Sequence, residues 1–205
     1  MKHISAVSQM TLCSLFAVLL CVLSPIAVFI GPVPVSLSLF AVLLSAAMLG
    51  PFRSLAAILA YLFMGALGLP VFGGGMGGFG VLLGPTGGFI WSYLLIAPIC
   101  GALYRFAFVG GRGRWMRGMR IGFATGLLAL AICYLFGTAQ YTLVANASLA
   151  TSALVCIVPF LLPDLAKVIL VCVLAERLWS VDAIRRAMLR RPSKPRSDEQ
   201  YENKL

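Results

Sequence analysis

The sequence predicts an all-α, polytopic membrane protein with six transmembrane helices and both termini in the cytoplasm. Of the 205 residues, 61% are hydrophobic and only 11% are charged, and the mean hydropathy is +1.01. A soluble globular protein carries about 45–50% apolar and about 25% charged residues. The apolar residues are gathered in long runs, and nearly all basic residues lie between these runs or after the last one.

The expected spans follow from the lengths of the apolar runs, because a helix needs about 20 apolar residues, with a range of about 17–25, to cross the hydrocarbon core. Turns rich in Gly and Pro separate the runs at residues 31–34 and at Gly50-Pro51. Longer loops are expected at residues 71–88, which are rich in glycine, and at residues 110–119, which are basic. We expect transmembrane helices at residues 7–29, 35–49, 53–69, 89–109, 120–144 and 164–179.

Two parts of this assignment have alternatives. The second and third spans are short and could form one re-entrant hairpin, but that would place Arg53 at mid-membrane, at a cost of about 2.5–3.5 kcal/mol or more. Two spans with Arg53 at the membrane surface are more favourable. The first span resembles a signal peptide, but Leu23-Ser24-Pro25 offers no cleavage site of the A-x-A type. We therefore expect this segment to remain as a span.

The positions of the basic residues give the orientation. With the N-terminus inside, 15 of the 16 Lys and Arg residues lie on the inner side and the outer loops contain none, as the positive-inside rule requires. These charges do not form a basic face on a polar domain, so nucleic-acid binding is excluded and a lipid membrane is the expected surrounding. We expect one membrane domain over residues 1–191 and a disordered, polar cytoplasmic tail over residues 192–205.

Two ionisable residues interrupt the last apolar run. Asp164 and Lys167 are three residues apart and therefore share one face of a helix. Pro163 just before Asp164 suits a helix start, so Asp164 could cap the helix and supply the counter-charge for a snorkelling lysine. The second interpretation is a polar pair at the outer face that meets a polar ligand. We favour the ligand site, because the outer loops could form a matching wall.

The loop at residues 71–88 contains a literal GxGxxG at Gly73, Gly75 and Gly78. A dinucleotide fingerprint is excluded, because no strand precedes the motif and no βαβ unit surrounds it. Glycine lets backbone approach a ligand or a neighbouring helix closely. Since apolar side chains are interspersed with the glycines, we expect a cap over an outward-facing pocket rather than a flexible linker.

Small residues recur every fourth position in two spans, a pattern that lets helices pack closely, within the chain or against a partner. The two stripes are Cys13, Ala17 and Cys21, and Gly118, Gly122 and Gly126.

No GxxxxGK[ST] phosphate loop is present, the only histidine is His3, and the six cysteines have no metal-binding spacing. We expect no catalytic residues, no cofactor and no metal, and energy for any transport would come from a partner.

Four motifs, in chain order, together resemble the BioY family, whose members are biotin-binding S components of energy-coupling factor (ECF) transporters. The motifs are Gly31-Pro32-Val33-Pro34-Val35-Ser36-Leu37, Val71-Phe72-Gly73-Gly74-Gly75, Gly84-Pro85-Thr86-Gly87-Gly88 and Pro159-Phe160-Leu161-Leu162-Pro163-Asp164-Leu165-Ala166-Lys167. The resemblance implies a six-helix, multi-pass protein of the bacterial cytoplasmic (inner) membrane that binds one biotin near the outer surface. It also implies an ECF T component and a pair of ABC-type ATPases as partners.

The resemblance also implies a binding site. Asp164 would accept hydrogen bonds from the ureido N–H groups of biotin, and Lys167 would meet a ligand oxygen. The lining expected from the loops and the fourth span comprises Val33, Pro34, Phe72, Gly75, Thr86 and Tyr93. The stripe Cys13, Ala17 and Cys21 would correspond to the family's first-helix stripe, thought to dock the T component.

Family members usually read Thr-Leu-Gln where this chain has Ser36-Leu37-Ser38, so an amide is missing from the first loop. The Arg-Gly that follows the second helix in the family is Arg53-Ser54 here. The alternatives to biotin uptake are an S component for another vitamin or a biotin-like compound, and a membrane scaffold whose Asp164–Lys167 pair is purely structural.

Overall fold

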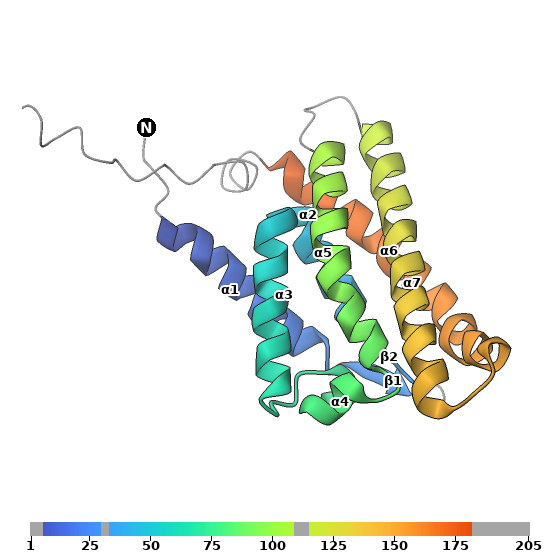
Figure 1. Cartoon of the computed structure of the whole chain (residues 1–205). Helices are drawn as coiled ribbons and strands as arrows, with labels where there is room; N and C mark the ends of the chain where they lie inside the picture. Colours follow the sequence, from blue (N-terminus) through green and yellow to red (C-terminus); the bar gives the residue numbers. More distant parts are fainter. Residues whose placement is uncertain (1–5, 30–32, 109–114, 182–205) are drawn as a thin grey trace, which may run out of the picture.

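The computed structural model describes residues 6–29, 33–108 and 115–181, and this part of the chain is mostly helical (Figure 1). The predicted tail over residues 192–205 lies outside the described residues. The elements, in chain order, are α1 (Ala6–Leu23), β1 (Ala27–Phe29), β2 (Pro34–Ser36), α2 (Ser38–Leu49), α3 (Pro51–Ala66), the 3-10 turn η1 (Gly73–Gly75), α4 (Phe79–Leu83), α5 (Gly87–Phe108), α6 (Trp115–Ala145) and α7 (Leu149–Ser180).

Three helices of the described chain are long and apolar enough to cross a membrane, within Gly87–Ala107, Gly118–Ala145 and Leu149–Ser180. This confirms the membrane-type, mostly helical fold class. The apolar stretches in α1, α2 and α3 are shorter. With 12 residues at about 1.5 Å each, α2 extends only about 18 Å. Because nearly all of α2 is buried inside the bundle, protein rather than lipid surrounds its ends.

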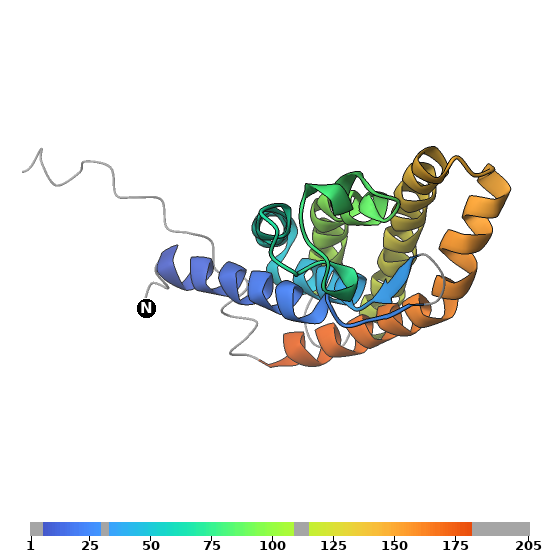
Figure 2. The ribbon, with the colours of Figure 1, turned by 90° about the horizontal axis from the view of Figure 1, so that it is seen from below.

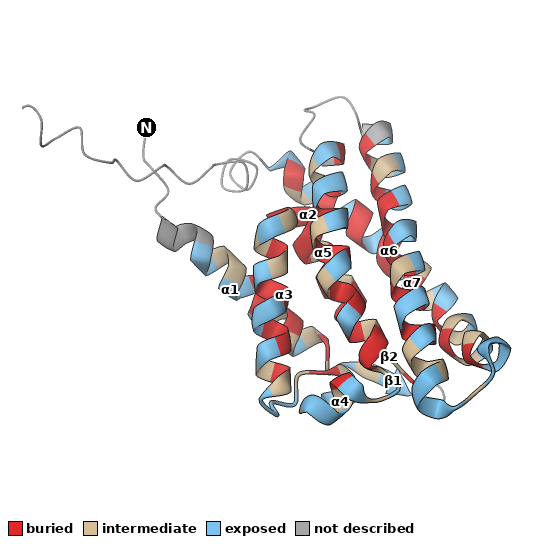
Figure 3. Ribbon diagram, viewed as in Figure 1, coloured by how far each residue is buried: buried red, intermediate tan, exposed pale blue. Residues whose placement is uncertain are grey.

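The helices form a bundle whose two ends differ (Figure 1). The β1–β2 hairpin, η1, α4 and the connection from α6 to α7 all lie at one end, and the turn from α2 to α3 lies at the other. Seen from below, the loop elements lie beside the ends of the helices (Figure 2). Buried residues face the space between the helices, and exposed residues cover the outer faces (Figure 3). The loop end is therefore where several segments distant in sequence meet.

Glycines allow several helices to approach each other closely. A Cβ at Gly126 of α6 would lie 2.3 Å from Val168 Cγ1 of α7, and a Cβ at Gly101 of α5 would lie 2.8 Å from the backbone of Pro51. The stripe Gly118, Gly122 and Gly126 is buried, so this stripe serves packing within the chain. On α1, Ala17 is also buried, whereas Cys13 and Cys21 are half-buried.

The first expected helix, residues 7–29, ends earlier than predicted. Helix α1 ends at Leu23, because Pro25 disfavours helical backbone in the residue before it and has no N–H to donate to a helical hydrogen bond. Residues 27–29 instead form β1, which pairs antiparallel with β2 in the register Ala27 to Ser36 and Phe29 to Pro34. The all-α prediction missed this hairpin, because a short apolar strand that follows an apolar helix does not change the hydrophobicity pattern of the sequence.

The prediction that the last helix starts behind Pro163 was wrong. Helix α7 begins at Leu149, and the Ser148 hydroxyl caps it by accepting the backbone N–H of Thr151 at 3.2 Å. Asp164 therefore lies mid-helix and is no cap. Prolines are tolerated inside membrane helices when neighbours satisfy the freed backbone groups, so Pro163 is not a reliable stop signal in an apolar run. Helix α6 likewise begins at Trp115, inside the stretch predicted as a basic loop.

Candidate ligand-binding site

A cavity lies among α2, α3, α5, α6 and α7, with the β1–β2 hairpin and the η1–α4 loop at its loop end. It encloses about 580 Å³ of empty space, including the part open to solvent. The apolar lining consists of Val33, Pro34, Leu39, Met76, Val81, Phe89, Ile90 and Phe160. The polar lining consists of Ser24, Ser36, Ser38, Tyr61, Thr86, Tyr93, Cys133, Asp164 and Lys167.

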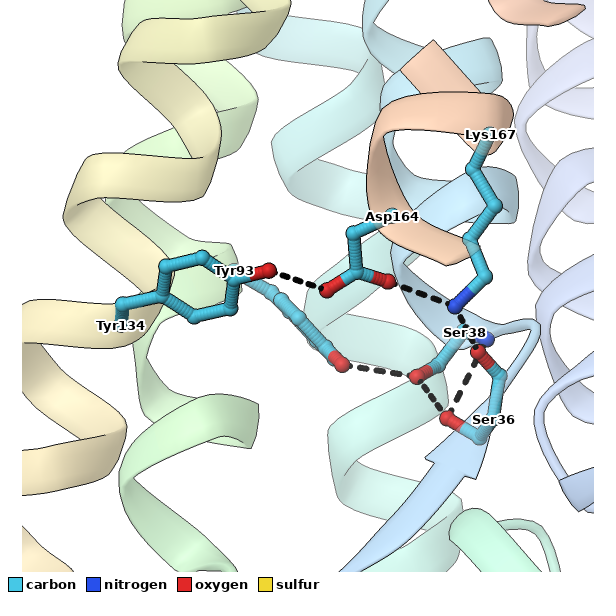
Figure 4. A network of polar contacts seen from close by, with 6 residues as sticks. All are labelled: Ser36, Ser38, Tyr93, Tyr134, Asp164 and Lys167. Atoms are coloured by element: carbon cyan, nitrogen blue, oxygen red, sulfur yellow. Dashed lines mark hydrogen bonds and ion pairs between the residues drawn. The ribbon is translucent and has the colours of Figure 1, made fainter. Parts of the chain in front are cut away.

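The charged pair of α7 is buried in the wall of this cavity (Figure 4). Lys167 Nζ donates to Asp164 Oδ1 at 2.7 Å and to the backbone oxygen of Ser36 at 2.7 Å. The Tyr134 hydroxyl of α6 donates to Asp164 Oδ2 at 2.9 Å. The exposed fraction is 4% for Asp164 and 9% for Lys167. Because buried charges are costly unless paired and hydrogen-bonded, these contacts are what makes the pair tolerable inside an apolar bundle.

The pair still has unused hydrogen-bonding capacity. A lysine ammonium has three N–H donors, and Lys167 uses two of them in the contacts above. An ionised carboxylate has about four lone-pair positions, and one described group contacts each oxygen of Asp164. This wall can therefore accept hydrogen bonds from a ligand at Asp164 and donate one at Lys167.

Neutral hydroxyl groups extend the polar wall. Ser36 Oγ and Ser38 Oγ lie 2.5 Å apart, and Ser38 Oγ lies 2.7 Å from the Tyr93 hydroxyl (Figure 4). A separate pair joins Ser24 Oγ at the end of α1 to the Tyr61 hydroxyl of α3 at 2.7 Å. The cavity thus combines one charged pair and two hydroxyl clusters with an apolar surface.

The loop that covers the cavity is tied to the bundle. Gln140 of α6 donates through Nε2 to the backbone oxygens of Leu82 at 2.9 Å and Gly84 at 2.8 Å. Trp91 Nε1 of α5 donates to the same Leu82 oxygen at 3.1 Å. These bonds satisfy the last carbonyls of α4 and fix the segment that carries Val81 and Thr86 into the cavity wall.

The structure brings most of the predicted site together. Val33, Pro34, Thr86, Tyr93, Asp164 and Lys167 all line the cavity.

Phe72 and Gly75 are not in the lining. The Phe72 ring is fully buried behind Tyr61, with the two ring centroids 5.5 Å apart and nearly perpendicular, and it fills the space beside Gly65. Gly75 has a φ of 75° and serves the tight turn of η1, a conformation that favours glycine. In the sequence both residues belong to the same motif as Gly73, which does line the cavity.

Sequence reasoning missed several polar residues of the wall. Tyr134 is 30 residues before Asp164 and sits in an apolar helix, where tyrosine looks like any other large side chain. Ser36 and Ser38 drew attention only because this chain lacks the glutamine amide that family members usually have in this loop. Nothing in the sequence marked Ser24 or Tyr61 as a site residue, because hydroxyl residues are common in membrane helices. Only three-dimensional packing shows that these two hydroxyl groups meet.

The comparisons with known proteins agree with one another. The family model described as "BioY family" matches residues 1–183. The chain is 33% identical over 181 residues to the biotin transporter BioY of Thermotoga maritima, covering 86% of this chain and 99% of that protein. It is 32% identical over 180 residues to the biotin transporter BioY of Rhodobacter capsulatus, covering 83% of this chain and 92% of that protein.

A solved structure shows the same fold. The crystal structure of the S-component for biotin from an ECF-type ABC transporter superposes with a TM-score of 0.80 at 24% identity, covering 92% of this chain and 99% of that chain. The long family-model match and the similar full-length relatives lead to one conclusion: this chain belongs to the BioY family.

Proposed function

We propose that this protein takes up biotin across the cytoplasmic membrane as the substrate-binding S component of an ECF-type ABC transporter. The observation that carries the proposal is the buried Asp164–Lys167 pair, which lines the cavity and keeps unused donors and acceptors. Membership of a family of biotin transporters supports the same substrate and a transporter rather than an enzyme.

The chemistry of the cavity matches the chemistry of biotin. Its ureido ring has two N–H donors and a carbonyl acceptor, its thiophane ring is apolar, and its tail ends in a carboxylate. Asp164 has lone pairs left for ureido N–H groups, and Lys167 has one N–H left for a ligand oxygen. Apolar residues such as Val33, Pro34 and Phe89 offer a surface for the thiophane ring and the tail. Hydrogen bonds that involve a charged group contribute roughly 1.5–3 kcal/mol each.

The proposed topology has six spans, with both termini in the cytoplasm and the loop end of the bundle outside. Arg53 in the first turn of α3 and Arg105 in the last turn of α5 lie at the end opposite the hairpin (Figure 1). Arg177 in the last turn of α7 lies at that same end. Because positively charged residues favour the cytoplasmic side, this distribution supports a cavity that faces outward.

Energy for uptake comes, in this proposal, from an ECF T component and a pair of ABC-type ATPases. The sequence has no GxxxxGK[ST] phosphate loop of its own. Docking of the T component along the first-helix stripe stays a prediction. It fits Cys13 and Cys21, which are half-buried, better than Ala17, which is covered by the chain's own bundle.

The deciding experiment is a binding assay on neutralised variants. Asp164→Asn and Lys167→Ala each leave the partner charge buried and unpaired, so each should weaken labelled-biotin binding by roughly tenfold or more, about 1.4 kcal/mol. The double variant Asp164→Asn with Lys167→Met removes both charges and leaves no orphan. Under the proposed function, it stays monodisperse and stable but binds biotin poorly.

Two controls make this result specific. Ser45→Ala removes a buried hydroxyl of α2 that donates to the Val42 oxygen, and Ser45 is not among the described residues that line the cavity, so biotin binding should be unchanged. In the parent, saturable binding should be competed by unlabelled biotin and not by thiamine or riboflavin. A stable double variant with the parent's affinity would overturn the site assignment, and competition by another vitamin would favour that vitamin as substrate.

A further inference from the structure

We propose that the Ser36 hydroxyl is a specificity-determining donor, oriented by a hydroxyl chain that runs from Tyr93 through Ser38 to Ser36. It would donate a hydrogen bond to an acceptor atom of the ligand beside the Asp164–Lys167 pair. This inference rests on the proposed function and adds a neutral residue to the recognition of the ligand's polar ring.

The chain connects three elements of the fold (Figure 4). Ser36 ends β2, Ser38 begins α2 and Tyr93 belongs to α5, and all three line the cavity. Ser38 and Tyr93 are each only 4% exposed, whereas Ser36 is half-buried. The accessible end of the chain is therefore Ser36, and the buried end is Tyr93.

Counting protons shows that one donor is left over. Three hydroxyl groups have three protons, and the two contacts among them, at 2.5 Å and 2.7 Å, use two. The third proton is free to bond elsewhere. The chain therefore presents a single neutral donor to its surroundings.

Two features place this donor on Ser36. A phenol is a stronger acid than a serine hydroxyl, so Tyr93 is the better donor to Ser38, and Ser38 then donates to Ser36. The backbone N–H of Ser38 also points at Ser36 Oγ, at 3.4 Å. Both lone pairs of Ser36 Oγ are then occupied, and the group can only donate outward.

The position of Ser36 relates this donor to the charged pair. Its backbone oxygen accepts from Lys167 Nζ at 2.7 Å, so the hydroxyl and the ammonium belong to one continuous polar wall. With Asp164 as the acceptor, this wall suits a ring that carries N–H groups next to a carbonyl oxygen. The serine hydroxyl offers the oxygen a donor without introducing a further buried charge.

The test compares biotin with its thione analogue, in which sulfur, a weak acceptor, replaces the ureido oxygen. Ser36→Ala removes the terminal hydroxyl but keeps the backbone oxygen that Lys167 needs. It should weaken biotin binding by roughly 3- to 10-fold and leave binding of the thione analogue nearly unchanged, so the preference for biotin collapses. Ser36→Thr retains the hydroxyl and should retain the preference.

Two further variants check the direction of the chain. Tyr93→Phe removes the buried end but still allows Ser38 to donate to Ser36, so most of the preference should remain. If Ser36→Ala does not purify, Ser36→Cys tests the same point with a weak S–H donor. Ser45→Ala on the same helix as Ser38 is the matched control for losing a buried hydroxyl.

The outcomes separate the two proposals. A parent protein that binds no biotin overturns the proposed function and this inference together. A parent that binds biotin, with Ser36→Ala unchanged or weakened equally for both ligands, overturns the inference alone. Loss of the preference in Tyr93→Phe but not in Ser36→Ala would overturn the assigned direction and make Tyr93 the donor.

Discussion

The close contact between α6 and α7 gives a prediction whose size follows from the structure. In Gly126→Ala, the new Cβ would lie 2.3 Å from Val168 Cγ1, whereas ordinary contacts start near 3.4 Å, so the atoms must separate by about 1.1 Å. Val168 is fully buried and β-branched, and a β-branched side chain in a helix has one strongly preferred rotamer. The helices themselves must therefore move apart.

The expected cost is the overpacking penalty minus the gain in helix propensity. Overpacking a core costs about 1–3 kcal/mol, and alanine is favoured over glycine in a helix by about 0.8–1.0 kcal/mol. We expect a net loss of up to about 2 kcal/mol in the free energy of unfolding. For a chain of this size, the upper limit of about 2 kcal/mol corresponds to a fall of roughly 4–8 °C in the melting temperature of the purified protein in detergent.

A double-mutant cycle checks that the contact is the cause. Val168→Ala removes both Cγ atoms, so Gly126→Ala should cost much less in that background, with a coupling of about 1 kcal/mol or more. Gly80→Ala in α4 is the control, because no atom lies within 4 Å of its Cβ position. Additive losses in the cycle would refute the close packing of α6 on α7 at this point.

Three further predictions concern the covering loop, the topology and the energy source. Gln140→Leu removes both hydrogen bonds to the end of α4, so bound biotin should exchange several-fold faster in a chase experiment; an unchanged release rate would show that this loop does not limit exit. Reporter fusions after Arg112 and Arg191 should read cytoplasmic and those near Gly77 external, whereas an external signal at Arg112 would contradict six spans. In a host without the ATPase partners, the protein should bind biotin but concentrate it poorly, and ATP-dependent accumulation by the purified chain alone would refute the need for partners.

The sequence predicted the charged pair and the loop wall because both break a strong pattern. An ionisable residue in an apolar run is costly, so Asp164 and Lys167 stand out without any structure. The same apolar background conceals Tyr134. Its hydroxyl reaches Asp164 only because α6 packs against α7 at the level of these two residues. This background also conceals the β1–β2 hairpin, since its strands are only three residues long and continue an apolar segment. Helix ends were predicted best where a tight turn must occur, as at Gly50, whose φ is 76°.

The two prolines inside α7 have a mechanical consequence. Pro159 and Pro163 have no N–H to donate to the carbonyls four residues earlier, so two successive turns of α7 before Asp164 each lack one backbone hydrogen bond. The helix changes direction along its length (Figure 2). A helix weakened in this way bends there more easily than elsewhere. Bending there would tilt the first turns of α7, which begin at Leu149, as one rigid segment. The turn that carries Asp164 and Lys167 would stay packed against α2. The cavity could then widen while the ion pair remains intact.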